Sequence, residues 1–338
     1  MIAVGLYKQP PPRASAYLGH NSTYFQLSPS LTWSNVISIR NRFKNSQYTN
    51  TFKLIITPTS QLLLPVLGIA LPNSKLILDL GWPMSDQVGT GRTFNAFVMR
   101  IKNHIIDFVA MHISDVLIVE TDAQAQRVQN KFWVRKKKIK TVYTSLDEAS
   151  WGVIPKPISL VSDSSNESKK ILIFYRGKYN KESGIENILE FASNLEDKFQ
   201  VIIATDKLPE LNIDSSNTII IEQFLEYSEL AYLYSIADLC LGQLTTESRT
   251  AYTLPHKYSE SAYFGKPYLS FESPPLQENG PNGGLIVIKN LGDISRVLRQ
   301  ETKTTLSARG KLNRKYYEQH LSQKKVVAVM EELFQQVI

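Results

Sequence analysis

Short apolar runs alternate with longer segments of helical period along almost the whole chain, and this alternation constrains the fold more than any other feature. A short apolar run bounded by polar residues is typical of a buried strand, and spacings of three and four indicate a helix. Strands alternating with helices predict parallel sheets covered by helices. The strand candidates are residues 2–6, 24–27, 52–56, 75–80, 116–119 and 139–143, then 171–175, 200–205, 218–222, 238–242, 267–271 and 284–288.

The alternation is interrupted once, between two similar halves. Residues 157–170 read PISLVSDSSNESKK, a serine-rich and charged stretch that is typical of a linker. At 338 residues the chain exceeds what one hydrophobic core usually serves. We therefore expect an α/β protein with two Rossmann-like, doubly wound domains in tandem.

Two helical segments have a clear apolar stripe. In residues 184–196 the apolar side chains follow the helical period, which predicts a helix that packs on a sheet. In residues 94–112 the stripe contains Phe97, Ile101, Ile105 and Phe108. We expect this second stripe to belong to the core, and the alternative is a face that dips into a membrane.

The positive charge is concentrated in the first half of the chain. Residues 1–150 hold 17 Lys and Arg against 8 Asp and Glu, and residues 1–78 hold seven basic side chains and no acidic one. Such asymmetry suits a surface held near something anionic, such as a phosphorylated substrate, nucleic acid or an acidic membrane. Because the second half is slightly acidic, we do not expect a nucleic-acid partner, and an anionic membrane surface remains a candidate.

Cysteine use and hydropathy indicate the compartment. Cys240 is the single cysteine and lies in an apolar run, so it predicts no disulfide and a reducing compartment. Neither a cleavable signal nor a long uncharged apolar run is apparent. We expect a cytoplasmic protein, with a peripheral position on the inner face of the membrane as a further expectation.

Glycine and lysine follow the first strand of the second domain. Residues 175–184 read YRGKYNKESG, where Gly177 lets the backbone turn closely and Lys178 and Lys181 sit on the loop. Ligands of open α/β sheets bind at the carboxyl ends of strands, near helix N-termini. The loop could hold a diphosphate, although glycine and lysine also occur in purely structural loops.

A second segment supplies a lysine and a glutamate on one helical face. Residues 254–267 read LPHKYSESAYFGKP, in which Pro255 can begin a helix and Gly265 can end it. Lys257 and Glu260 are three residues apart and therefore share a face. The lysine could neutralise phosphate oxygens and the carboxylate could accept ribose hydroxyls; the alternative is a surface ion pair.

Metal-dependent chemistry has no visible ligands in the sequence. There is no Asp-x-Asp, and the five histidines show no metal-ligand spacing, so we expect no metal and no cofactor. In the first domain Asp79 ends the predicted strand in LILDLGWP. It is the best-placed polar group there for an acceptor or a donor sugar, and a strand-end cap is the alternative.

The ordered motifs of the second half resemble the retaining glycosyltransferases of the GT-B fold, the group that includes glycogen and sucrose synthases and many bacterial polysaccharide and glycolipid transferases. The matching segments are YRGKYNKESGIENILEFA, FLEYSELAYLYSIADLCLG, LPHKYSESAYFGKPYLS and NGGLIVIKNLGDISRVL. The tail RKYYEQHLSQKKVVAVMEELFQQVI is similar to the family's closing helix, which crosses back to the first domain. The resemblance implies domains at 1–160 and 161–318 and a crossover helix at 319–338.

The resemblance also implies a function and a site. A sugar would pass from a nucleotide-diphosphate donor to a polysaccharide, glycolipid or lipid-linked acceptor, with retention and without a metal. Glu260 would bind the donor ribose, and Gly177, Lys178, Lys181 and Lys257 would hold the diphosphate. In this family the leaving diphosphate is thought to assist attack by the acceptor, so Lys178 would also act in catalysis.

The sequence departs from the family's pattern at several positions. The family's arginine is Lys178 here, Ser183 replaces a lysine, and Tyr252 stands where a carboxylate is expected. These losses leave a non-catalytic, nucleotide-binding partner subunit as the main alternative. A sugar-nucleotide epimerase of the same shape is a further one, but its expected cluster of histidine and carboxylate is not visible.

Overall fold

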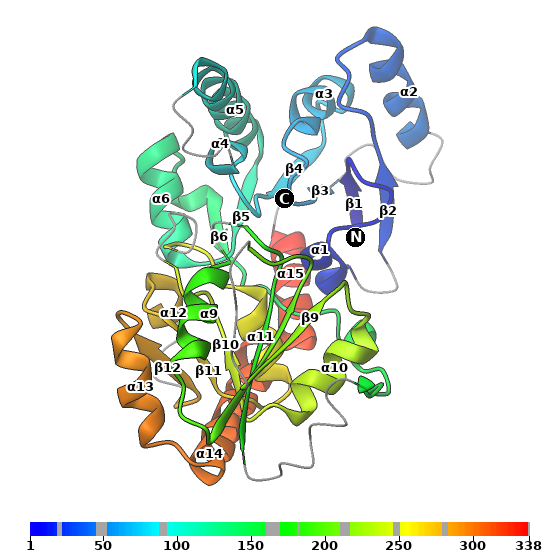
Figure 1. Ribbon diagram of the computed structural model, residues 1–338. Coiled ribbons are helices and arrows are strands. Elements are labelled where there is room, and N and C mark those ends of the chain that lie inside the picture. Colours follow the sequence, from blue (N-terminus) through cyan, green and yellow to red (C-terminus); the bar gives the residue numbers. More distant parts are fainter. Residues whose placement is uncertain are drawn as a thin grey trace. The chain divides into compact units, whose positions relative to one another are not determined.

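The computed structural model describes residues 1–18, 22–44, 53–87, 93–159, 170–180, 183–209, 217–245, 251–278 and 283–336. The described chain forms two compact units (Figure 1). Unit 1 comprises residues 1–147 and 323–338, and unit 2 comprises residues 148–322. Most of the predicted linker, 160–169, and also Lys181 lie outside the described residues.

Each unit is built on a parallel six-stranded sheet, as predicted. In unit 1 the strand order is β2-β1-β3-β4-β5-β6, and in unit 2 it is β12-β11-β10-β7-β8-β9. The first sheet contains β1 (Ile2–Gly5), β2 (Thr23–Gln26), β3 (Lys53–Ile56), β4 (Lys75–Asp79), β5 (Val116–Val119) and β6 (Ile139–Thr141). The second contains β7 (Ile171–Arg176), β8 (Phe199–Thr205), β9 (Thr218–Glu222), β10 (Leu239–Leu241), β11 (Tyr268–Phe271) and β12 (Leu285–Ile288).

Helices connect the strands, as a parallel sheet requires. Unit 1 contains α1 (Pro12–Tyr17), α2 (Trp33–Lys44), α3 (Leu63–Ala70), α4 (Met84–Gln87), α5 (Phe94–Ile113), α6 (Asp122–Phe132), a 3₁₀ turn (Lys136–Lys138) and α15 (Gln323–Gln336). Unit 2 contains α7 (Glu148–Trp151), α9 (Ile185–Ser193), α10 (Tyr227–Ile236), α11 (His256–Tyr263), α12 (Pro274–Glu278), α13 (Gly292–Arg299), α14 (Lys303–Tyr316) and a π turn (Tyr317–Leu321).

The long C-terminal helix α15 returns to unit 1 and contacts α1, as the resemblance implied. Its residues Val326, Met330 and Leu333 pack with strand residues such as Ile55 and Ile77. The alternate residues of the same strands, such as Leu54 and Leu78, point to the other face of the sheet. There they form a separate core. This period-two division follows from strand geometry, because successive side chains point to opposite faces.

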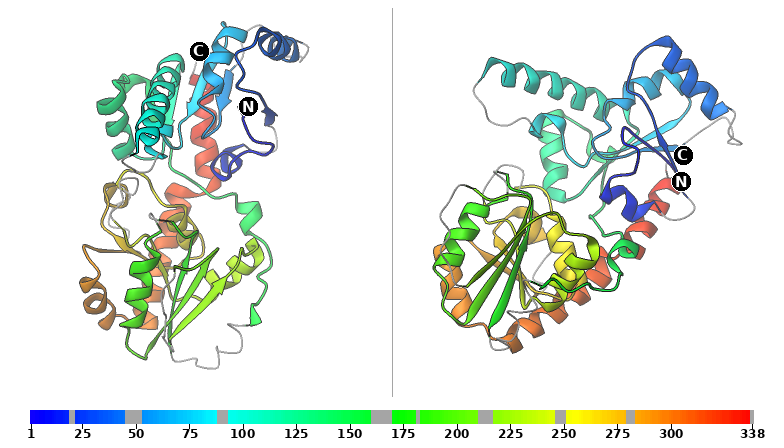
Figure 2. Two further views of the ribbon diagram at one scale, coloured as in Figure 1. Left: turned by 45° about the horizontal axis from the view of Figure 1, so that its top comes forward. Right: turned by 45° about the vertical axis from the view of Figure 1, so that its right-hand side comes forward.

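Unit 2 has the same layered construction (Figure 2). Helix α9 packs through Ile185, Ile188 and Leu189 on one face of the sheet, in the pattern that the sequence predicted. Helix α10 lies on the other face, where the ring of Tyr234 contacts that of Phe174. The carboxyl ends of β7, β8 and β9 consequently meet at one edge of the sheet, which the covering helices leave open.

The structure corrects the prediction for the stripe on α5. Phe97, Ile101 and Ile105, which we expected in the core, are exposed, and Phe108 is half-buried. The buried face of the helix instead carries Asn103, Asp107, Ala110 and Met111, and the last two belong to the hydrophobic core. The helix itself was predicted correctly, but periodicity does not indicate which of its faces the protein buries.

Candidate functional site

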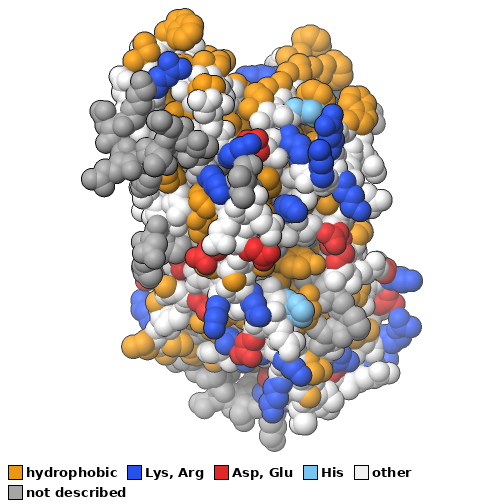
Figure 3. All heavy atoms as spheres, turned by 180° about the vertical axis from the view of Figure 1, so that it is seen from behind, with side chains coloured by type: hydrophobic (Ala, Val, Ile, Leu, Met, Phe, Trp, Pro, Cys, Tyr) orange, Lys and Arg blue, Asp and Glu red, His pale blue; other side chains and the backbone are white. Residues whose placement is uncertain are grey.

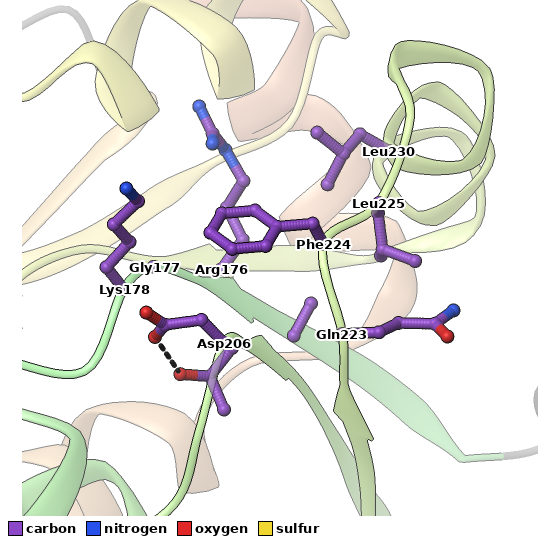
Figure 4. Close-up of a pocket in the computed structure, with 10 residues that line it drawn as sticks. Arg176, Gly177, Lys178, Asp206, Gln223, Phe224, Leu225 and Leu230 are labelled. Carbon is purple, nitrogen blue, oxygen red and sulfur yellow. Dashed lines mark hydrogen bonds between the residues drawn. The ribbon is translucent and has the colours of Figure 1, made fainter.

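A pocket opens at the carboxyl edge of the unit 2 sheet, where ligands of such sheets bind. It has a volume of about 120 Å³. Its lining comes from the ends of three adjacent strands, the residues after them and helix α10: Arg176, Gly177, Lys178, Ala204, Thr205, Asp206, Gln223, Phe224, Leu225 and Leu230 (Figure 4). Gly177 and Lys178, which the sequence singled out, are therefore at this edge.

Glu260 lies next to this pocket through its pairing with Arg176. The Arg176 Nε donates to Glu260 Oε2 at 2.7 Å, and its Nη2 donates to Oε1. Tyr234 Oη donates a further hydrogen bond to Oε2 at 2.5 Å. Glu260 is 2% exposed, whereas part of the Arg176 side chain remains exposed. A carboxylate can accept about four hydrogen bonds, so these three leave roughly one position open.

Glu260 and Arg176 each stabilise the charged form of the other. Burial alone would raise the pKa of Glu260, but the charge and hydrogen bonds of Arg176 hold that pKa below its ordinary value. Burial alone would likewise lower the pKa of Arg176, and the Glu260 carboxylate raises it instead. Glu260 is thus a buried, ionised carboxylate that fixes a guanidinium at the edge of the pocket.

Lys257 lies one helical turn before Glu260 and approaches the glycine loop. Its Nζ donates to Tyr175 Oη at 3.2 Å and lies 4.4 Å from the centre of that ring. A Cβ at position 177 would meet Tyr175 Oη at 2.6 Å and Lys257 Nζ at 2.9 Å, so Gly177 permits this close approach. Burial and the neighbouring Arg176 charge lower the pKa of Lys257 to about 7.

Phe224 and Asp206 complete the described pocket. Phe224 is 72% exposed, and the Nζ of Lys178 lies 5.2 Å from the centre of its ring. Figure 4 shows Lys178 and Phe224 on either side of Arg176. The Asp206 Oδ1 accepts the backbone N–H of Tyr179 at 2.7 Å, which lowers the pKa of Asp206 and ties the glycine loop to the end of β8.

The end of the glycine loop is structural. Ser183, which stands where the resemblance expects a lysine, is buried, and its Oγ donates to the carbonyl of Asn180 at 2.5 Å. Gly184 follows with a φ of +66°, a conformation that glycine adopts without strain, and α9 begins directly after it. Tyr252, at the position of the expected carboxylate, is also buried.

Asp79 lies in unit 1 and has no exposed surface. Arg13 Nε donates to its two oxygens at 2.9 and 3.1 Å, and Tyr17 Oη donates to Oδ2 at 2.7 Å. Arg13 also bonds Thr144 Oγ1 and the carbonyl of Val142. Because Asp79 has no exposed surface, a sugar does not reach it in this conformation. The geometry therefore favours a structural role for Asp79.

Sequence reasoning missed three residues that this site contains. Arg176 is the last residue of β7 and was passed over for Gly177 and Lys178 beside it. Tyr234 faces Glu260 from α10, and Phe224 follows β9 in a segment where we proposed no site. The charge of Arg176 at the end of an otherwise apolar strand was a usable signal, whereas nothing in the sequence indicates that Tyr234 meets Glu260.

No protein-family model matches the chain, and no curated protein sequence matches it significantly. Solved structures are nevertheless similar over almost its full length. The sucrose-phosphate synthase of Thermosynechococcus elongatus is 13% identical with a TM-score of 0.68, covering 100% of this chain and 88% of that one.

HepE of Anabaena, solved in complex with UDP, is 10% identical with a TM-score of 0.71, covering 99% of each chain. Its complex with UDP-glucose gives a TM-score of 0.70 at the same identity, covering 99% of this chain and 98% of that one. At these identities the likeness concerns the fold alone: the chain has the GT-B fold, as the resemblance implied.

Proposed function

We propose that this GT-B protein is a glycosyltransferase that moves a sugar from a nucleotide-diphosphate donor to a polysaccharide, glycolipid or lipid-linked acceptor, with retention and without a metal. The observation that carries the proposal is the meeting of Arg176, Lys178 and Lys257 around Gly177, at the carboxyl edge of the unit 2 sheet. Clustered cations beside a close-approach glycine suit a diphosphate.

Each side chain has a part in donor binding. Lys178 and Lys257 neutralise phosphate oxygens, while Gly177 leaves the space in which the Lys257 ammonium approaches the loop. Glu260 accepts a ribose hydroxyl at the hydrogen-bond position that Arg176 and Tyr234 leave open. The exposed ring of Phe224 can stack on the nucleobase, an interaction worth roughly 1–3 kcal/mol per base in proteins that bind bases this way.

In catalysis, the same cations stabilise the departing diphosphate. When the bond between the sugar and the diphosphate breaks, negative charge grows on the leaving oxygen. Lysine charges already in position stabilise that charge without further rearrangement. We therefore assign Lys178 a catalytic role in addition to binding, with Lys257 beside it. The acceptor binds on the side of unit 1, and the basic surface of that unit holds the protein near an anionic membrane.

Donor screening tests the activity. The protein is incubated with uridine, guanosine and adenosine diphosphate sugars, and release of the nucleoside diphosphate is measured. We expect release from one donor, and a loss of release in Lys178→Met. The matched control is Lys198→Met, because Lys198 precedes β8 and therefore lies at the opposite edge of the sheet.

A non-catalytic partner subunit is the second candidate, favoured by the burial of Tyr252 and Ser183 where the family has a carboxylate and a lysine. Calorimetric titration with UDP and with the donor sugars separates the two. Binding without release from any donor would support the partner subunit, and a lack of both would overturn the nucleotide site itself.

A further inference from the structure

Helix α5 carries most of its large apolar side chains on an exposed side. Its outward side, which we name the α5 face, consists of Phe94, Phe97, Val98, Ile101 and Ile105, all of them exposed. Phe94 is 78% exposed and Phe97 57%. These positions are separated by three, one, three and four residues, so they lie on one side of a helix. An apolar face of this kind on a protein surface usually marks an interaction site.

Hydrogen bonds fix the rotation of α5 about its axis. On the opposite side, the Asp107 carboxylate accepts the backbone N–H groups of Met84 and Ser85 at 2.9 and 2.8 Å. Asn103 Nδ2 donates to the carbonyl of Met84 at 3.1 Å. Turning the α5 face inward would expose these groups and leave buried partners unsatisfied. The hydrogen bonds of Asn103 and Asp107 on the inner side therefore keep the apolar side facing outward.

Basic and aromatic residues flank the C-terminal end of the same helix. Lys138 Nζ donates to the carbonyls of Met111 and His112, which anchors the 135–138 segment to α5. In that segment Arg135, Lys136 and Lys137 are exposed.

Trp133, just before this segment, is 77% exposed, and its ring contacts Phe108 of α5 edge-on, with centroids 6.5 Å apart. Figure 3 shows hydrophobic side chains gathered where α5 lies, with Lys and Arg side chains beside them. Within residues 94–113 the acidic residue is Asp107, which is buried, so the α5 face carries no opposing negative charge.

We propose that the α5 face, together with Trp133 and Arg135–Lys137, lies on an anionic lipid bilayer with its apolar side chains in the headgroup boundary. An apolar helix face, flanking cations and an interfacial tryptophan are the features of helices that lie in the membrane plane. The exposed cations Arg135, Lys136 and Lys137 outnumber the exposed acid nearby, Asp115, which already pairs with Lys75 at 3.7 Å. This excess of positive charge favours anionic lipid over a second copy of this basic unit. The inference names the membrane-contacting surface of the proposed function and is independent of the donor site.

Vesicle flotation tests the surface. The full chain is mixed with phosphatidylcholine vesicles that contain or lack phosphatidylglycerol, at low and at physiological salt. We expect flotation with the anionic vesicles, weaker at higher salt because the charges are screened. Phe97→Ser/Ile101→Ser should abolish flotation at either salt concentration. Lys136→Glu/Lys137→Glu should lower affinity on the order of 100-fold or more, since each cation near anionic lipid contributes about fivefold and charge reversal adds repulsion to the loss of attraction.

Matched variants separate the surface from general effects. Ile154→Ser removes an apolar side chain that is exposed in unit 2, and it should float like the unmodified protein. Tryptophan fluorescence should shift to shorter wavelength on anionic vesicles, and Trp133→Phe should remove the shift. Circular dichroism checks that each variant is folded, which we expect because the replaced side chains are exposed.

Three outcomes would overturn the proposal. The first is a chain that stays in solution with anionic vesicles at low salt. The second is flotation that survives Phe97→Ser/Ile101→Ser. The third is a dimer in sedimentation that Phe97→Ser/Ile101→Ser converts to a monomer, without flotation, which would assign the face to a second copy. UDP-glucose titration of the same variants reports separately on the donor site, so loss of one property does not imply loss of the other.

Discussion

Glu260 is the buried charge of the candidate site, and Arg176 is the cation that compensates it. Removing one partner of a buried pair leaves the other uncompensated, and this costs more than removing both. Because Arg176 is partly exposed, we expect Arg176→Met to lower the free energy of unfolding by about 1–3 kcal/mol. Arg176→Met/Glu260→Gln should recover part of that loss. Urea denaturation measures the free energy of unfolding of the two single variants, Arg176→Met and Glu260→Gln, and of the double variant. If the loss in the double variant equals the sum of the losses in the single variants, the two side chains are not coupled.

Lys257 gives donor binding a defined pH dependence. Its ordinary pKa of 10.5 is lowered to about 7, so the ammonium form prevails below pH 7 and is lost as the pH rises. A bound diphosphate favours the charged form, and binding above pH 7 must therefore take up a proton. We expect the affinity for UDP-glucose to fall between pH 6 and 9, by up to about tenfold per unit above pH 7.

Calorimetric titration in two buffers of different ionisation enthalpy measures this proton uptake directly. Lys257→Met should bind more weakly at low pH and show no uptake, whereas Lys198→Met should keep the full pH dependence. An affinity for UDP-glucose that is constant from pH 6 to 9 would exclude Lys257 as a phosphate ligand.

The residues that sequence could predict in this site are those whose position follows from a single element. Gly177 and Lys178 follow a strand directly, and Lys257 and Glu260 share one helical face. Arg176 could have been chosen from its place at the strand end, but its partner could not, because the pairing joins residues 84 positions apart. Whether Glu260 is open to a ligand or already paired is decided by such tertiary contacts.

At the scale of elements, the strands and their order in the chain were predictable because buried strands of a parallel sheet are nearly continuous apolar runs. The orientation of α5 was not predictable, because a stripe at helical spacing indicates that two faces of a helix differ but not which of them is buried. The rotation of the helix is fixed by hydrogen bonds of Asn103 and Asp107, whose partners at residues 84 and 85 are separated from the helix by part of the chain.

The two faces of α5 should differ in their effect on stability. Asp107→Ala leaves two backbone N–H groups without their acceptor in a buried place, and we expect a loss of about 2 kcal/mol. Phe97→Ser/Ile101→Ser changes exposed side chains and should alter stability by less than about 0.5 kcal/mol per site. If the stripe were core, the double variant would cost several kcal/mol. Thermal and urea unfolding of the three proteins distinguish these cases.

At the scale of the whole molecule, the described donor-site residues all belong to unit 2, while unit 1 is completed by the chain's return through α15. Deleting residues 323–338 removes Val326, Met330 and Leu333 from the unit 1 core. At about 1.5–3 kcal/mol for each buried side chain, the deletion costs on the order of 5–9 kcal/mol. That is comparable with the whole stability of a typical domain.

We therefore expect the shortened chain to contain an unfolded or barely stable unit 1 and an intact unit 2. Scanning calorimetry should show one transition weakened or absent and another preserved. A saturating nucleotide raises the unfolding temperature of the unit that binds it, so UDP should shift the preserved transition. Residues 148–322 expressed alone should show the same shift. If UDP shifts nothing in this segment while it stabilises the full chain, the nucleotide site needs residues of unit 1, and our assignment of donor binding to unit 2 is wrong.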